Sequence, residues 1–331
     1  MHKNILEKGV KEMKKIVSLA LVLVLVLAAF AFVACDTKEN NDNKDNNNDA
    51  ATTPAEKTYN LAIGVVVTPS LASNKVSETV ATIVTDADNK IVLCKIDCVE
   101  YTAQYDDAGA LVTTAPTSKV ALGDHYVMPA GSWATQVSNL EKFVVGKTQA
   151  EAAAAVVNGY AADADLKASC SFYIGDLAKA IDNAFKSEHK VSFTSTATAF
   201  TAGLSVVGAV KDSSTDDAKN ATYTATFASA VLVDGKVVAA ILDTAEAQLV
   251  GITEEGADSV AFAGTKREQG DAYAMTSGTW YAQADAYAKS AVGKSASDIA
   301  TLATEGVAGC TMPYSTYDFK AVLESAVKAA K

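Results

Sequence analysis

The hydrophobic and polar positions divide the chain into three stretches. An apolar run over residues 16–34 follows two lysines, residues 36–57 are almost entirely polar, and the remainder alternates with the periods of strands and helices. The basic start, the apolar run and the small residues before Cys35 predict a secretory signal peptide over residues 1–35. The polar stretch is rich in Asn and Asp and cannot bury enough apolar surface to order itself, so residues 36–58 are predicted to be a disordered linker.

The end of the apolar run carries a further signal. Its last residues, Phe32-Val33-Ala34-Cys35, resemble the bacterial lipobox, in which the cysteine is diacylated and becomes the mature N-terminus. This resemblance implies a lipid anchor at Cys35 and an extracytoplasmic location at the cell membrane. The alternative is a membrane-spanning anchor, since about 19 apolar residues are long enough to cross a bilayer. Under both interpretations the body of the chain faces outward.

Downstream of the linker, the pattern predicts the same elements twice. Apolar, β-rich runs predict strands on both sides of an Asp-Asn turn in the first half and of an Asp-Gly turn in the second. The strands are expected over residues 80–84, 91–101, 223–233 and 236–243. Helical spacing then predicts helices over residues 133–144, 280–291, 176–186 and 316–331. The first two of these helices are expected to end at Gly146 and Gly293. Thr148 with Glu151, and Ser295 with Asp298, predict capped helices between them.

A shift of 147 residues aligns the chain with itself. Between residues 119–147 and 266–294, 12 of 29 positions are identical, where about two are expected by chance. The repeat predicts two tandem homologous domains, residues 59–190 and 191–331. Since strands precede helices in each copy, the predicted class is α+β, with helices packed on an antiparallel sheet in each domain.

Charge and histidine content narrow the possible functions. The net charge is −11 and Arg267 is the only arginine, so the chain repels phosphate backbones and nucleic-acid binding is disfavoured. With three histidines, one of them in the leader, neither a His-rich metal site nor a repeated Ser-His-Asp triad can be built. No nucleophile–base pair recurs in both copies, so a classical hydrolase is disfavoured too.

The order of the predicted elements ends each copy with a small-residue motif ahead of the final amphipathic helix. This order resembles the bacterial FMN-binding domain family, in particular membrane-anchored surface lipoproteins that carry the domain once or twice. The family motif is Asp-x-x-Ser/Thr-Gly-Ala-Ser/Thr, and a flavin transferase can esterify its last hydroxyl to the FMN phosphate. Here the motif corresponds to Asp165–Ser171 and Glu305–Thr311. Both copies keep the acid and the final hydroxyl, while the middle positions differ from the family pattern.

The resemblance implies roles for several motif residues. Ser171 and Thr311 would be the attachment points, and Gly309 would allow close backbone approach. The carboxylates of Asp165 and Glu305 could help to bind Mg²⁺ or activate the hydroxyl during transfer. The alternative is that both hydroxyls are polar residues on ordinary loops that lead into a helix.

A second repeated element contains an aromatic pair and an amide. Its residues are Tyr126, Trp133 and Gln136 in the first copy and Tyr273, Trp280 and Gln283 in the second. They could present an aromatic face and an amide donor to a flat ring. The alternative is that the aromatic residues anchor the core, which leaves the two glutamines least explained. The repeated lysines could contact an anionic ligand, but solvated surface lysines are the expected role; they are Lys119, Lys147, Lys266 and Lys294.

Taken together, these patterns predict a cell-surface lipoprotein with two FMN-binding-like domains. It would be a flavin carrier in extracytoplasmic electron transfer, with a flavin transferase and membrane redox proteins as partners. The alternative is a non-catalytic binding or interaction lipoprotein that keeps the fold without a flavin.

Overall fold

The computed structural model describes residues 55–330 except 114–115, 198, 304–305 and 312–318. The predicted signal peptide, most of the linker, Cys35 and Glu305 lie outside the described residues. Residues 53–331 form one compact unit. Its class is mixed α+β, with 28% helix, 42% strand and antiparallel sheets, as the element pattern predicts.

The first sheet has five antiparallel strands in the order β4-β3-β2-β1-β9. The strands are β1 (Lys57–Ser70), β2 (Lys75–Thr85), β3 (Ile91–Tyr105), β4 (Leu111–Thr113) and β9 (Val191–Ser195). The turn between β2 and β3 is closed by Asn89, whose positive φ of 55° suits the short Asn side chain. The last strand in the order, β9, belongs to the second predicted domain by sequence and pairs with β1.

The second sheet has four antiparallel strands in the order β10-β11-β12-β13. The strands are β10 (Thr201–Asp212), β11 (Asn220–Val233), β12 (Lys236–Val250) and β13 (Ser259–Thr265). Asp234 and Gly235 form the tight turn between β11 and β12, with φ of 49° and 74°, so the predicted Asp-Gly hairpin is confirmed. In both sheets the strands are longer than predicted, because the added residues pair with β4 and β13 or pack against the other sheet.

The two sheets face one another and share one apolar layer. Side chains from β1, β2 and β3 meet those from β11 and β12 in a single buried cluster. Two tyrosines cross this layer: the Tyr223 hydroxyl donates to Asn74 O (2.7 Å), and the Tyr101 hydroxyl lies 3.2 Å from Thr224 O. Strands buried on both faces have continuous apolar runs, which is the pattern of Leu61 to Val66 in β1.

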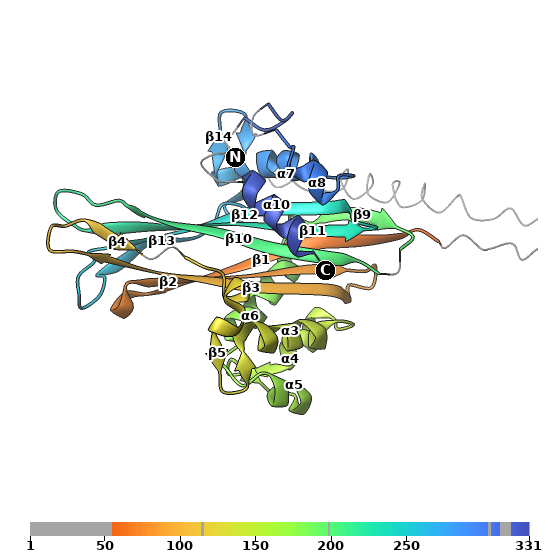
Figure 1. The fold of residues 1–331 in the computed structure, drawn as a ribbon, viewed down its shortest axis with the longest axis horizontal. Coiled ribbons are helices and arrows are strands. Elements are labelled where there is room, and N and C mark those ends of the chain that lie inside the picture. The colour runs from red at the N-terminus through yellow and green to blue at the C-terminus, as the bar shows by residue number, and fades with distance from the viewer. Residues whose placement is uncertain (1–54, 114–115, 198, 304–305, 312–318, 331) are drawn as a thin grey trace, which may run out of the picture. The chain divides into compact units, whose positions relative to one another are not determined.

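Helices cover the outer face of each sheet (Figure 1). The first sheet carries α3 (Trp133–Val144), α4 (Gln149–Ala154), α5 (Ala164–Ser169) and α6 (Gly175–Lys186). The second carries α7 (Trp280–Lys289), α8 (Ala296–Ile299) and α10 (Phe319–Ala329). Short elements lie between the longer strands and helices. The short helical elements are η1 (Leu71–Ser73), α2 (Lys119–Leu122), η2 (Gly123–His125) and η3 (Gly270–Ala272). The two-residue strand pairs are β5–β6 (Val127–Met128, Gly131–Ser132), β7–β8 (Val156–Val157, Tyr160–Ala161) and β14–β15 (Ala274–Met275, Gly278–Thr279).

The helix ends follow local signals in the sequence. Both predicted capping boxes are present, at Thr148 with Glu151 and at Ser295 with Asp298. The helix α3 has the predicted bounds, while α7 ends two residues earlier than predicted. Beyond α7 the amide N–H groups of Ser290, Ala291 and Val292 donate to the carbonyl three residues back, so the helix ends in a tighter turn.

Two glycines bring a helix close to each sheet. Gly64 of β1 lies against the backbone of α6, and Gly203 of β10 lies against the backbone of α10. A methyl group at Gly64 would collide with Ala180 O and Ala184 N, and one at Gly203 would collide with Ala326 O. The missing side chain therefore sets how closely helix and strand pack in both halves.

Candidate functional site

Each half holds one exposed hydroxyl against a buried glutamine. In the first half, the amide N–H and the hydroxyl of Ser171 both donate to Gln136 Oε1, at 2.8 and 3.1 Å. In the second, the amide N–H and the hydroxyl of Thr311 donate to Gln283 Oε1, at 2.8 and 3.0 Å. The glutamine side chains are 0% and 1% exposed, while Ser171 and Thr311 are exposed. The structure thus joins two motifs that the sequence analysis singled out separately.

The buried amides also use their donor side. Gln136 lies in the first turns of α3, and its Nε2 donates to Gly131 O (3.1 Å). Gln283 occupies the matching place in α7, and its Nε2 lies 3.8 Å from the sulfur of Met275. A glutamine satisfied in this way keeps one orientation, so its Oε1 holds each hydroxyl and the neighbouring main chain in a fixed position.

The backbone around the two hydroxyls differs between the halves. In the first half, Ser169 is the last residue of α5. In the second, Gly309 has φ of 80°, a conformation that favours glycine. This difference explains why a glycine stands at position 309 and a serine at the corresponding position 169. Buried cysteines, Cys170 and Cys310, precede both hydroxyls and anchor the turns in the helical layers.

The predicted carboxylates are described in one half. Asp165 is exposed in the first turn of α5, where its main-chain oxygen accepts the hydroxyl of Ser169 (3.1 Å). Its counterpart Glu305 lies outside the described residues. Within the described part of the chain, no three His, Cys, Asp or Glu side chains gather as a metal site requires.

The repeated aromatic residues divide between core and margin. Trp133 and Trp280 are 3% and 0% exposed and lie in the cores beneath the two helical layers, so neither offers a free ring face. Tyr126 and Tyr273 are half-buried. Lysine ammonium groups lie 5.1 and 4.3 Å from their ring centroids, so these rings have cationic neighbours already.

For Lys119 and Lys266, the prediction of a solvated surface lysine is wrong. The side chain of Lys266 is 2% exposed, with Nζ 3.1 Å from Glu246 Oε1 and 2.6 Å from the hydroxyl of Tyr273. Lys119 Nζ lies 2.9 Å from Glu100 Oε1, and its side chain is 12% exposed. Glutamates at matching positions of β3 and β12 bury both lysines by pairing with them, which explains their recurrence structurally.

Two buried aspartates hold the segments that begin with these lysines. Asp97 Oδ1 accepts the amide N–H groups of Cys98 (2.7 Å) and Val120 (3.1 Å). Asp243 Oδ1 likewise accepts those of Thr244 (2.7 Å) and Arg267 (3.2 Å). Burial raises the pKa of both carboxyls to about 6, against the lowering effect of these hydrogen bonds. In the sequence, both aspartates follow an apolar residue, as Ile96-Asp97 and Leu242-Asp243, in the predicted strands 91–101 and 236–243. This repeated pair was the signal that could have identified them.

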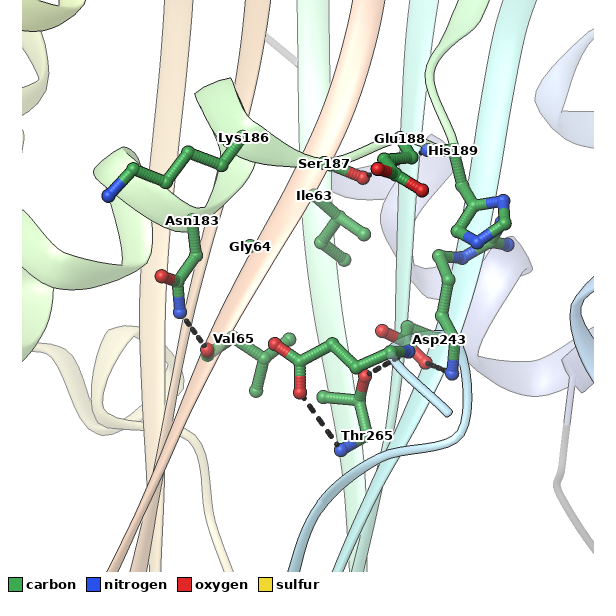
Figure 2. A pocket seen from close by; sticks show the side chains of 12 residues that line it. Ile63, Gly64, Val65, Asn183, Lys186, Ser187, Glu188, His189, Asp243 and Thr265 are labelled. Atoms are coloured by element: carbon green, nitrogen blue, oxygen red, sulfur yellow. Dashed lines mark hydrogen bonds between the residues drawn. The ribbon is translucent and has the colours of Figure 1, made fainter. Parts of the chain in front are cut away.

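A cavity of about 290 Å³ lies where β1 and α6 meet β12 and the segment after β13 (Figure 2). Its lining residues are Ile63, Gly64, Val65, Asn183, Lys186, Ser187, Glu188, His189, Asp243, Thr265, Arg267 and Glu268. Both signs of charge are present, over an apolar floor from β1. No local sequence pattern predicts this cavity, because its two sides are distant in the sequence.

The only arginine is part of the cavity wall. Arg267 is 3% exposed; its Nη2 donates to Leu242 O (2.6 Å) and to Asp285 Oδ1 (2.7 Å). In the repeat alignment Val120 takes its place in the first half, so this ion pair has no counterpart there. The sequence offers one signal for a special role of Arg267: it is the single arginine of an acidic chain.

Replacing the buried glutamines tests the hydroxyl geometry. Gln283→Leu, and separately Gln136→Leu, leaves an amide N–H and a hydroxyl without their acceptor, so each is expected to lower the free energy of unfolding by about 1–3 kcal/mol. Urea unfolding measures this effect. Gln269→Leu, at an exposed position, is the matched control and should change stability by less than about 0.5 kcal/mol. A buried-site variant that unfolds like the control would contradict the role of the glutamine.

Comparisons with family models, with curated proteins and with solved structures find no match to this chain. Among the described residues, no helix has both the length and the apolar character to cross a bilayer.

Proposed function

We propose that this protein is an exported, lipid-anchored carrier of flavin, with Ser171 and Thr311 as attachment points for the FMN phosphate. The observation that carries the proposal is the exposed hydroxyl held by a buried glutamine in both halves. A hydroxyl on an ordinary surface loop has no need of a fixed, buried acceptor. The lipid anchor rests on the lipobox-like sequence at Cys35, and the redox role would be in extracytoplasmic electron transfer.

We further propose that the two halves are tandem homologous domains of the FMN-binding type. Several arrangements recur with the same geometry, and the duplication accounts for all of them. They are the hydroxyl–glutamine pair, the buried strand aspartate, the lysine–glutamate pair and the glycine beneath the last helix.

The residues at the hydroxyls fit a phosphoester. Ser171 and Thr311 are exposed residues, and the nearby alanines at 168 and 308 are small and exposed too. In the attachment step the hydroxyl oxygen forms a bond to the phosphorus of an activated flavin phosphate. The bond from that phosphorus to its leaving group breaks, and the hydroxyl proton passes to solvent. Gln136 and Gln283 accept the hydroxyl hydrogen bonds and so hold each oxygen in position. A bound flavin supplies reversible electron transfer.

Intact-mass spectrometry tests the proposal. The full chain, produced together with a flavin transferase, should gain the mass of two FMN esters, and its flavin fluorescence should survive denaturation. Thr311→Ala and Ser171→Ala should each lose one increment, and the double variant both. Thr276→Ala, which removes another exposed threonine in the second half, should keep both. An unchanged wild-type mass would refute covalent attachment.

The second candidate is a binding lipoprotein without flavin. The observation that favours it is the cavity of about 290 Å³ with its mixed charges, a size close to the lower limit of small-molecule sites. A small polar molecule would occupy it. Wild-type protein without flavin, combined with loss of a bound small molecule in Glu268→Gln, would favour this alternative.

A further inference from the structure

Beside Ser171, two exposed tyrosines form an aromatic surface that the core does not use. Tyr160 and Tyr173 are 55% and 54% exposed, and their ring centroids lie 5.6 Å apart with planes at 83°. Val157, which pairs with Tyr160 across β7 and β8, is 56% exposed. Exposed aromatic side chains gathered in one place mark a contact surface more often than scattered ones do.

The geometry of this surface is fixed by the backbone beneath it. The ring of Tyr173 lies against Gly159 and Gly175, where a methyl group on either glycine would collide with it. The amide N–H of Ile174 donates to Gly159 O (2.7 Å), which ties the loop after Ser171 to the turn of the β7–β8 hairpin. The ring of Tyr173 is therefore held in place, and Tyr160 packs against it, while each tyrosine stays more than half exposed.

We propose that Tyr160 and Tyr173 form the contact surface for the planar ring of the flavin attached at Ser171, one tyrosine ring stacking on the flavin and the other, nearly perpendicular to the first, meeting the edge of the flavin. This inference rests on the proposed function and deepens it by assigning the site of the ring. Tyr173 is two residues from Ser171, so the two Cα atoms lie within about 7 Å, a span that the ribityl chain between phosphate and ring can cover. Planar rings stack on aromatic side chains without needing specific hydrogen bonds.

Because the flavin is attached to the chain, weak stacking is sufficient to keep its ring on the tyrosines. A ring attached at Ser171 is present near the tyrosines at an effective concentration in the millimolar range. The repeated aromatic residues at 126, 133, 273 and 280 do not compete for this role, because they are buried or half-buried and in contact with lysines or the core.

Titration of riboflavin, which has the ring and no phosphate, tests the surface separately from attachment. The full chain should quench riboflavin fluorescence saturably, since tyrosine donates an electron to an excited flavin. Tyr160→Leu with Tyr173→Leu keeps an apolar surface and removes both rings, and should weaken binding at least tenfold. Phe262→Ala removes another exposed aromatic side chain, on β13, and should leave binding unchanged.

The outcomes separate the two proposals. Absence of saturable quenching in wild type up to millimolar concentrations, or equal binding by the double leucine variant, overturns the contact surface. Intact mass decides attachment at Ser171 independently. Quenching that depends on both tyrosines without a mass increment leaves a non-covalent flavin site and refutes the covalent one. A mass increment without such quenching leaves the carrier and refutes this surface.

Discussion

Replacing Gly203 with alanine is expected to lower the free energy of unfolding by about 3 kcal/mol or more. The added methyl group would collide with the main-chain oxygen of Ala326 in α10 and with the amide nitrogen of Ala330, the residue after the helix. Neither is the end of a flexible side chain, so the helix itself must move away from β10. Overpacking of a core usually costs about 1–3 kcal/mol, and displacement of a backbone places this case at the upper end.

The same movement would open the core beneath the helix. The helix α10 covers the second sheet with Phe319, Val322 and Leu323, all fully buried, and the ring of Phe319 meets Trp280 edge-to-face with centroids 5.7 Å apart. A shift of α10 would separate these side chains. An ordinary glycine-to-alanine change in a strand instead stabilises by reducing the entropy of the unfolded chain, so the expected sign is distinctive.

Urea unfolding followed by tryptophan emission measures this effect and locates it. Trp280 reports on the layer of α10 and Trp133 on the helices of the first half, so Gly203→Ala should change the native emission of Trp280. Gly64→Ala, the corresponding change against α6, should destabilise similarly and affect Trp133. Ser205→Ala on β10 is the control, with an expected change below about 0.5 kcal/mol. A Gly203→Ala protein as stable as this control would contradict the close approach.

The parts of the fold that the sequence predicts are those with local causes. Asp234-Gly235 forms its turn because both residues accept positive φ, and Thr148 with Glu151 caps a helix within one turn. In contrast, β1 and β10 were not predicted. Leu61 to Val66 in β1 is buried on both faces and therefore shows no alternation of apolar and polar residues. The sequence of one strand also does not determine which sheet it will pack against.

The candidate site divides in the same way. Ser171 and Thr311 were found from a local motif, and Gln136 and Gln283 from the repeat. Their hydrogen bonds join residues 35 and 28 positions apart, which no periodicity encodes. The burial of Lys266 was not predicted either, because its partner Glu246 lies on β12 and is distant in the sequence.

At alkaline pH, Glu78→Gln is expected to stabilise the protein on the order of 4 kcal/mol. Glu78 lies on β2 in the layer between the sheets and is 0% exposed. Its Oε2 accepts the Tyr101 hydroxyl (2.7 Å), while Oε1 finds no hydrogen-bond partner among the described residues. Burial raises its pKa from 4.5 to about 8, the Tyr101 hydrogen bond opposes this, and the charge of Glu246 adds to it.

The sign follows from proton binding in the two states. Between about pH 4.5 and 8 the unfolded chain has lost the Glu78 proton and the folded protein keeps it. The free energy of unfolding therefore falls as pH rises through this window, and the Glu78 contribution becomes constant above pH 8. The carboxyls of Asp97, Asp243 and Glu141, whose pKa values burial raises to about 6, 6 and 7, add slopes of the same sign. These slopes are present in both proteins and cancel in the difference.

Urea unfolding of wild type and Glu78→Gln from pH 5 to 9 isolates this single group. The two proteins should agree within about 1 kcal/mol at pH 5, where Glu78 is protonated and similar in shape to glutamine, and should diverge steadily up to pH 8. Glu100→Gln is the matched control on the neighbouring strand. Burial raises the pKa of Glu100, but Lys119 and Lys75 outweigh burial and leave this pKa below its usual value. Its replacement should therefore lower stability at neutral pH and give no alkaline gain. Parallel profiles for wild type and Glu78→Gln would show that Glu78 ionises in the folded protein as readily as in the unfolded chain, and that water reaches the layer between the sheets.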